Sequence, residues 1–238
     1  MKLLFAGPSI FGARLNLGDV LLRPPAVHGD ISLAIARGAK AIGLVDGSFG
    51  WVASVWHKEI LFALQGGVNI YGGASMGALR AAECAHFGMV PVGKIAHWYL
   101  DGTLDDDGDV AVVQCPPELD FQPLTEAVVD TLATVSELDR LGLISPNECI
   151  ALQTATRLVH FRDRTVATLI EQALPATRHD AVAAAYHQHR VGLKTADALE
   201  VLEAVKASRN SRRTPTQWQF AQSSFWEQAL DDLVLRNR

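Results

Sequence analysis

The chain has 238 residues, a net charge of −5, and 49% hydrophobic against 20% charged residues. This balance is typical of a globular protein with a sizeable core, and it excludes the basic surface that nucleic acid or an anionic membrane would attract. No apolar run is long enough to cross a membrane, and the three cysteines form no Cys-x-x-Cys pair. We therefore expect a cytoplasmic protein with no disulfide framework, metal or cofactor.

The first half of the chain alternates short apolar runs with helical patterns. Strands are expected at residues 2–6, 40–46 and 68–71, and helices at residues 30–37, from about 54 to 64, and directly after 75. Strands separated by helices predict parallel βαβ crossovers, and hence a Rossmann-like α/β fold.

The second half has a different texture. Apolar residues recur there at helical spacing, first at Leu124, Val128, Leu132, Val135 and Leu138, and again at Leu199, Leu202 and Val205. We therefore predict an α/β core over residues 1–120, followed by an all-helical region over residues 121–238.

The turn between residues 73 and 77 carries the strongest chemical signal. It reads Gly-Ala-Ser-Met-Gly between an apolar strand and a helix, which is the arrangement of a nucleophile elbow. The elbow would raise the Ser75 hydroxyl above the sheet and direct the N–H of Met76 towards an oxyanion. The alternative is a glycine-rich turn in which Ser75 only caps the following helix.

Other polar residues should share the same edge of the sheet. Sites in parallel α/β sheets lie beyond the carboxyl ends of the strands, so Gly7, Ser9, Asp46, Gly47 and Ser48 are expected to line a pocket with Ser75.

A nucleophilic serine needs a base. If Ser54 caps the helix that follows, His57 lies in its first turn near the site, where Asp46 could orient its ring. Lys58 is the competing base, in a Ser–Lys dyad. The alternative for both side chains is simple exposure to solvent.

Glu59 falls within the apolar stripe of the same helix. A carboxylate on a buried face needs a partner, and Arg80 on the next helix predicts a buried ion pair that fixes helix packing. The acidic run over residues 105–109 is better interpreted as a solvated turn than as a cation site.

Together these residues resemble the TfuA-like family over about the first half of the chain. The resemblance rests on four strings: Gly7-Pro8-Ser9, Asp46-Gly47-Ser48-Phe49, Ser54-Val55-Trp56-His57-Lys58-Glu59-Ile60, and the ten residues from Ala74 to Glu83. Asp101-Gly102 and the acidic run that leads into Val110 are also similar.

The resemblance implies a partner and a reaction. TfuA-like proteins are associated with YcaO enzymes, which activate a peptide amide with ATP so that sulfur replaces its oxygen. The TfuA-like protein would supply sulfide by hydrolysing the C-terminal thiocarboxylate of a ThiS-like sulfur carrier. Ser75 would attack the acyl carbon, the Met76 N–H would bind the oxyanion and His57 would activate water. The carrier tail would occupy a narrow cleft over the sheet, and the helical half would dock YcaO.

Two other functions fit the same residues. A non-catalytic adaptor would only hold the carrier tail and recruit YcaO. A patatin-like serine esterase would pair Ser75 with an aspartate of an Asp-Gly sequence, and both Asp46-Gly47 and Asp101-Gly102 are available. His57 also precedes Ser75, unlike the order in α/β-hydrolases, which places the base assignment in question.

Overall fold

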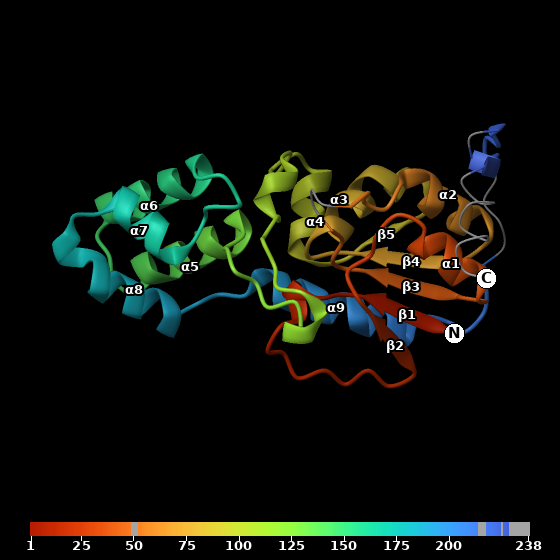
Figure 1. Cartoon of the computed structure of the whole chain (residues 1–238), viewed down its shortest axis with the longest axis horizontal. Coiled ribbons are helices and arrows are strands. Elements are labelled where there is room, and N and C mark those ends of the chain that lie inside the picture. The colour runs from red at the N-terminus through yellow and green to blue at the C-terminus, as the bar shows by residue number, and fades with distance from the viewer. Residues whose placement is uncertain (49–51, 214–217, 225, 229–238) are drawn as a thin grey trace.

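A parallel sheet organises the first half of the chain. The computed structural model describes residues 1–48, 52–213, 218–224 and 226–228. Within this part, five strands form one parallel sheet in the order β2-β1-β3-β4-β5 (Figure 1). The strands are β1 (Lys2–Phe5), β2 (Val20–Arg23), β3 (Ala41–Leu44), β4 (Asn69–Gly72) and β5 (Val90–Pro91). The predicted α/β fold is thereby confirmed, although the short strands β2 and β5 were not predicted.

The strands carry apolar side chains on both faces of the sheet, and helices cover both faces. Leu3 and Phe5 pack in one core with the first helices, whereas Leu4 and Ala6 pack in a second core beneath the last long helix. The covering helices are α1 (Asp30–Ala36), α2 (His57–Gln65) and α3 (Met76–Cys84) on the first face, and α9 (Leu193–Ala207) on the second (Figure 1). Continuous burial of this kind is typical of parallel sheets.

Helix α9 approaches the sheet closely at Gly43. A Cβ atom at this position would lie 2.7 Å from the Leu4 side chain and 2.8 Å from that of Val205, so a larger residue would separate helix and strand. The predicted boundary at residue 120 assigns α9 to the helical region, but the helix packs on the sheet.

The remaining helices extend the molecule beyond one end of the sheet. They are α4 (Gly93–Leu100), α5 (Val128–Arg140), α6 (Pro146–Leu158), α7 (Val166–Ala173) and α8 (His179–Gln188). Helices α5 to α8 enclose a separate core that includes Leu138, Leu152, Ile170 and Val182 (Figure 1). The predicted helical character of the second half is confirmed by helices α5 to α9. Residues 208–213 and 218–223 form no helix, and residues 214–217, 225 and 229–238 lie outside the described part. No helix in the described ranges is long and apolar enough to cross a membrane.

Candidate functional site

The candidate site lies beyond the carboxyl ends of β1, β3 and β4, beside the point where the strand order reverses. Strand β4 ends at Gly72 and helix α3 begins at Met76, so Ser75 occupies the predicted strand-to-helix turn. The left-handed residue of this turn is Ala74, with φ of 66°, rather than Ser75 itself. A Cβ at Gly77 would lie 1.8 Å from the Leu44 carbonyl oxygen, so only glycine lets α3 start this close to β3.

Asp46 fastens the loop after β1 to the end of β3. Its Oδ2 accepts hydrogen bonds from the N–H groups of Gly7 and Ser9, at 2.8 and 3.0 Å, and its Oδ1 accepts from the Ser9 hydroxyl at 2.6 Å. The carboxylate is buried, and all three donors belong to the loop after β1. The predicted meeting of these segments occurs, but Asp46 orients a backbone loop and not a histidine.

A lysine that sequence reasoning missed lies beside Ser75. The Lys194 ammonium donates a hydrogen bond to the carbonyl oxygen of Val110 at 2.7 Å, and the Ser75 hydroxyl donates to the same oxygen at 3.5 Å. Both side chains are buried, each in a residue that is 2% exposed. The fold therefore brings a serine from the first half and a lysine from the second half to one shared acceptor.

Burial changes the acid–base character of this lysine. Removal from water lowers the pKa of Lys194 below its ordinary value, against the opposing attraction of Asp46, Asp130 and Glu126. A lowered pKa makes the neutral amine, which can accept a proton, more accessible than in an exposed lysine. Perturbed groups of this kind are found preferentially at functional sites.

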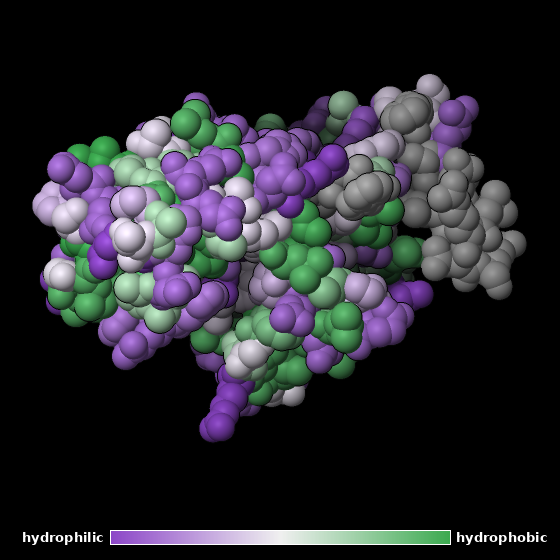
Figure 2. Space-filling model, turned by 60° about the vertical axis from the view of Figure 1, so that its left-hand side comes forward, coloured by the Kyte–Doolittle hydropathy of each residue, from purple (hydrophilic) through white to green (hydrophobic). Residues whose placement is uncertain are grey.

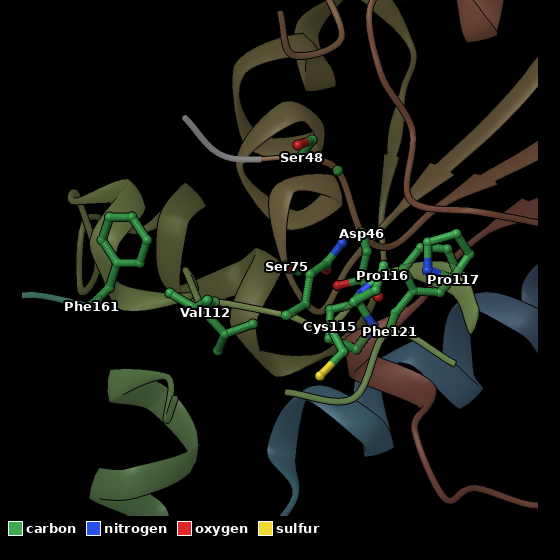
Figure 3. Close-up of a pocket in the computed structure, with 13 residues that line it drawn as sticks. Asp46, Ser48, Ser75, Val112, Cys115, Pro116, Pro117, Phe121 and Phe161 are labelled. Atoms are coloured by element: carbon green, nitrogen blue, oxygen red, sulfur yellow. The ribbon is translucent and has the colours of Figure 1, made fainter. Parts of the chain in front are cut away.

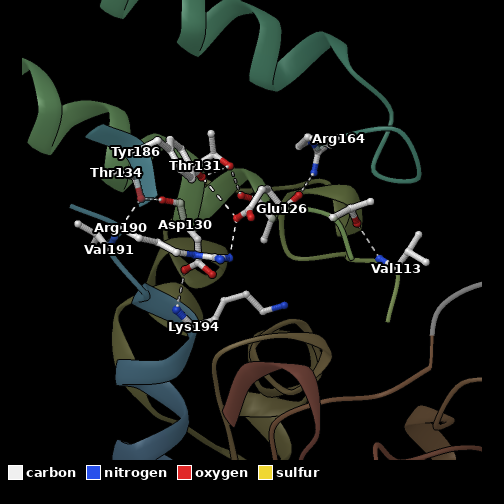
Figure 4. Close-up of polar contacts among 12 residues, drawn as sticks. Val113, Glu126, Asp130, Thr131, Thr134, Arg164, Tyr186, Arg190, Val191 and Lys194 are labelled. Carbon is white, nitrogen blue, oxygen red and sulfur yellow. Dashed lines mark hydrogen bonds and ion pairs between the residues drawn. The ribbon is translucent and has the colours of Figure 1, made fainter. Parts of the chain in front are cut away.

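A network of polar contacts holds the start of α9 against α5 (Figure 4). The backbone N–H of Lys194 donates to Oδ1 of Asp130 at 2.9 Å, so this carboxylate caps the first turn of α9. Beside it, Oε2 of Glu126 accepts from Arg190 at 2.7 Å and from the hydroxyl of Tyr186 at 3.4 Å. Burial raises the pKa of both carboxylates. These contacts fix the position from which the Lys194 side chain reaches Val110.

Ser75 opens into a cavity of about 350 Å³ (Figure 3). Asp46, Gly47 and Ser48 line it with Ser75, as predicted, and residues 112–117 form the opposite wall. Gly7 and Ser9 instead face two neighbouring hollows, and that of Ser9 is shared with Lys194.

Met76 is the first residue of α3. Its N–H belongs to the first helical turn, whose donors have no partner within the helix and suit an anion.

The two predicted bases lie away from Ser75, and this prediction is wrong. Helix α2 begins at His57, with Trp56 rather than Ser54 at the N-cap position. Nε2 of His57 lies 2.6 Å from Oε2 of Glu83, near the far end of α3, about 10 Å along the helix from its start.

Charge pairing accounts for the position of the imidazole. Burial alone would raise the pKa of Glu83, but hydrogen bonds from His57 and Arg80 outweigh it and hold the pKa below its ordinary value.

Lys58 donates to the Ser223 hydroxyl at 3.0 Å and lies over the Phe220 ring, so it contacts the C-terminal segment.

The predicted Glu59–Arg80 pair is also wrong. Glu59 is fully buried, but its carboxylate accepts from the N–H of Gly29, at 3.0 and 2.9 Å, and lies 3.0 Å from Nδ1 of His28. Arg80 donates to the Val55 carbonyl and to Glu83. The glutamate thus binds the start of α1, because that helix end offers unpaired N–H groups.

Glu59→Ala should therefore destabilise the protein, by about 3–5 kcal/mol, since it leaves buried donors without an acceptor. Arg80→Ala should cost about 1 kcal/mol or less, because its partner Glu83 is partly exposed. Urea unfolding measures both changes. Equal losses for the two variants would contradict this assignment.

The acidic run forms a short 3₁₀ turn, Asp107–Asp109, in which the Asp106 side chain accepts from the Gly108 N–H. Among the residues that the structure describes, no group of three or more histidine, cysteine or carboxylate side chains could hold a metal ion.

The sequence did contain a signal for Lys194. It precedes Ala198, Val201, Leu202 and Val205 by spacings that place all five on one helical face. A lysine on an apolar stripe indicates a buried cation, but its proximity to Ser75 depends on the return of α9 to the sheet.

These features define an α/β protein in which a strand-to-helix turn presents a serine beside a buried lysine. A family model described as TfuA-like protein matches residues 46–165, which is half of the chain. The chain therefore belongs to the TfuA-like family, as the resemblance predicted. The matched region includes Asp46, Ser75 and Val110, whereas Lys194 lies outside it. None of the curated proteins matches this chain.

Proposed function

We propose that this protein hydrolyses the C-terminal thiocarboxylate of a small ThiS-like sulfur-carrier protein, with Ser75 as nucleophile and Lys194 as its base. The observation that carries the proposal is the shared contact of both side chains with the Val110 carbonyl. Ser75 also lines the cavity of about 350 Å³. A buried lysine of lowered pKa is a base of the kind that activates serine in Ser–Lys dyads.

The reaction divides into acylation and hydrolysis. The Lys194 amine takes the hydroxyl proton as Oγ of Ser75 bonds to the acyl carbon. The N–H of Met76, at the start of α3, stabilises the oxyanion. The carbon–sulfur bond then breaks, and the Lys194 ammonium returns the proton to the departing sulfur, which leaves as hydrosulfide. An acyl-serine remains, and the Lys194 amine is neutral again. Water, losing a proton to Lys194, attacks the ester; the carrier carboxylate is released and Ser75 regains its proton.

The released sulfide would serve a YcaO-type enzyme that thioamidates a ribosomal peptide or protein. This part of the proposal rests on family membership. The helical assembly of α5 to α8 extends beyond the end of the sheet (Figure 1), and only Phe161, between α6 and α7, reaches the cavity from it. Its outer surface is therefore the part that we assign to a partner.

Sulfide release from a thiocarboxylated ThiS-type carrier tests the proposal. Ser75→Ala should lower the rate at least 10³-fold, because removal of a nucleophile leaves only binding and oxyanion stabilisation. Ser136→Ala, on an exposed part of α5, is the matched control and should retain the wild-type rate. Undiminished release by Ser75→Ala would contradict the nucleophile assignment.

The same assay separates the alternatives. Firm binding of carrier and YcaO without sulfide release by the wild type would assign the protein as an adaptor. Faster hydrolysis of a simple ester than of the thiocarboxylate would assign it as an esterase.

A further inference from the structure

Strand β2 forms one free edge of the sheet. Strand β2 pairs with β1 on one side, and no strand within the described residues pairs with its other side. Leu21, Leu22 and Arg23 are all exposed. An edge strand offers N–H and C=O groups that pair with an added extended chain.

A groove begins where β2 ends. It has a volume of about 620 Å³, and we call it the β2 groove; its walls include Ile10, Phe11, Leu22, Arg23 and Phe121. Phe11 and Leu22 are more than one-third exposed. Exposing neighbouring apolar side chains to water is unfavourable, and such patches mark interaction sites. Figure 2 shows hydrophobic surface on the lowest part of the molecule, where Figure 1 places β2 and the loop before it.

The β2 groove meets the cavity of Ser75 at one side chain. Phe121 lines both hollows, and it packs against the backbone of Gly7 between them. Its position is set by a hairpin in which the N–H of Cys115 donates to the Gln122 carbonyl at 2.8 Å. The two hollows therefore lie side by side between the edge strand and the serine, with Phe121 as their common wall.

We propose that the C-terminal tail of the protein substrate binds as an added parallel strand on β2 and then passes Phe121 to reach Ser75. This inference rests on the proposed function. The direction follows from the geometry: the acyl group must arrive at the carboxyl edge of the sheet, so the tail runs parallel to β2. An extended tail pairs with a strand edge through its main-chain N–H and C=O groups alone and can still reach Ser75 with its C-terminus, which favours such a tail as the occupant.

The strand spacing sets the length of the tail. From a position outside β2 to β4 is four intervals, or about 19 Å, which about six extended residues would span. About four more residues would pair with β2. The tail must therefore have about ten residues free of the folded part of the substrate.

Leu22 offers a specific test of this pairing. The Arg23 carbonyl accepts from the N–H of Ala6, the residue after β1, so the backbone groups of the preceding residue, Leu22, face the free edge. Leu22→Pro removes an outward N–H without removing a bond to β1. Leu22→Ala shortens the same side chain but keeps the N–H, and is the matched control.

The experiment compares binding of the carboxylate form of a ThiS-type carrier with turnover of its thiocarboxylate and of thioacetate. Leu22→Pro should weaken carrier binding and raise the carrier KM at least tenfold, with kcat unchanged. Thioacetate is too small to reach β2, so its turnover should not change. Leu22→Ala, which keeps the N–H, should bind the carrier several-fold more tightly than Leu22→Pro, and circular dichroism should show both variants folded.

The outcomes separate this inference from the proposed function. If the wild type releases no sulfide but Leu22→Pro still loses carrier binding, the docking site stands and the hydrolase assignment fails. Equal carrier affinity of Leu22→Pro and the wild type overturns the docking site. The docking site is also overturned if the wild type is a dimer that Leu22→Pro dissociates while carrier binding stays intact. In that case the edge of β2 binds a second copy of the chain.

Discussion

Lys194→Met should lower the rate of sulfide release by about 10²–10⁴-fold, the contribution expected of a general base. The variant should fold as well as the wild type or better, because methionine fills a similar volume and leaves no buried ammonium to desolvate. Lys206→Met, on the partly exposed far end of the same helix, is the matched control and should retain the wild-type rate. Sulfide release and urea unfolding measure the two effects separately. A Lys194→Met variant with full activity would remove the base assignment.

The pH dependence provides a second readout for this residue. The neutral amine is the active form, so the wild-type rate should rise with pH through the lowered pKa of Lys194 and then level off. Between that pKa and the ordinary lysine value, the unfolded chain binds more protons than the native protein. The free energy of unfolding should therefore increase with pH in this window, and Lys194→Met should remove the increase. A wild-type rate that falls with pH would contradict the assignment.

Asp46→Ala should destabilise the protein by about 3–5 kcal/mol and abolish sulfide release. The substitution leaves the N–H groups of Gly7 and Ser9 and the Ser9 hydroxyl without their acceptor in a buried place. It also removes a carboxylate that attracts the Lys194 ammonium.

Ser9→Ala is the appropriate comparison for Asp46→Ala, because it removes one of these hydrogen bonds and should cost about 1 kcal/mol. Denaturant unfolding gives both values. If Asp46→Ala loses no more than Ser9→Ala, the carboxylate does not hold the loop as the structure indicates.

The errors in the predicted site share one physical cause. His57, Lys58 and Glu59 were judged by their positions on one helix, and that spacing correctly placed Glu59 on the buried face. The spacing could not identify what faces them. Glu59 accepts from an N–H group at the start of α1, His57 contacts Glu83, and Lys58 donates to Ser223. Each partner belongs to another segment of the chain that packs against α2.

Local pattern was sufficient where the determining forces are local. The alternation of apolar runs and helical patterns predicted the parallel sheet, and the two glycines around Ser75 predicted the turn, since both depend on residues adjacent in the chain. The edge rule for parallel sheets then brought Gly7, Asp46 and Ser75 together.

The sequence by itself thus determined the sheet, the serine at its strand-to-helix turn and the family to which the chain belongs. The tertiary structure alone decided which charged side chain shares a hydrogen-bond acceptor with that serine. Lys194 and Ser75 are separated by more than a hundred residues, and only the return of α9 across the sheet brings both to the Val110 carbonyl. Long-range packing of this kind follows from the burial of whole helix faces, which no local spacing records.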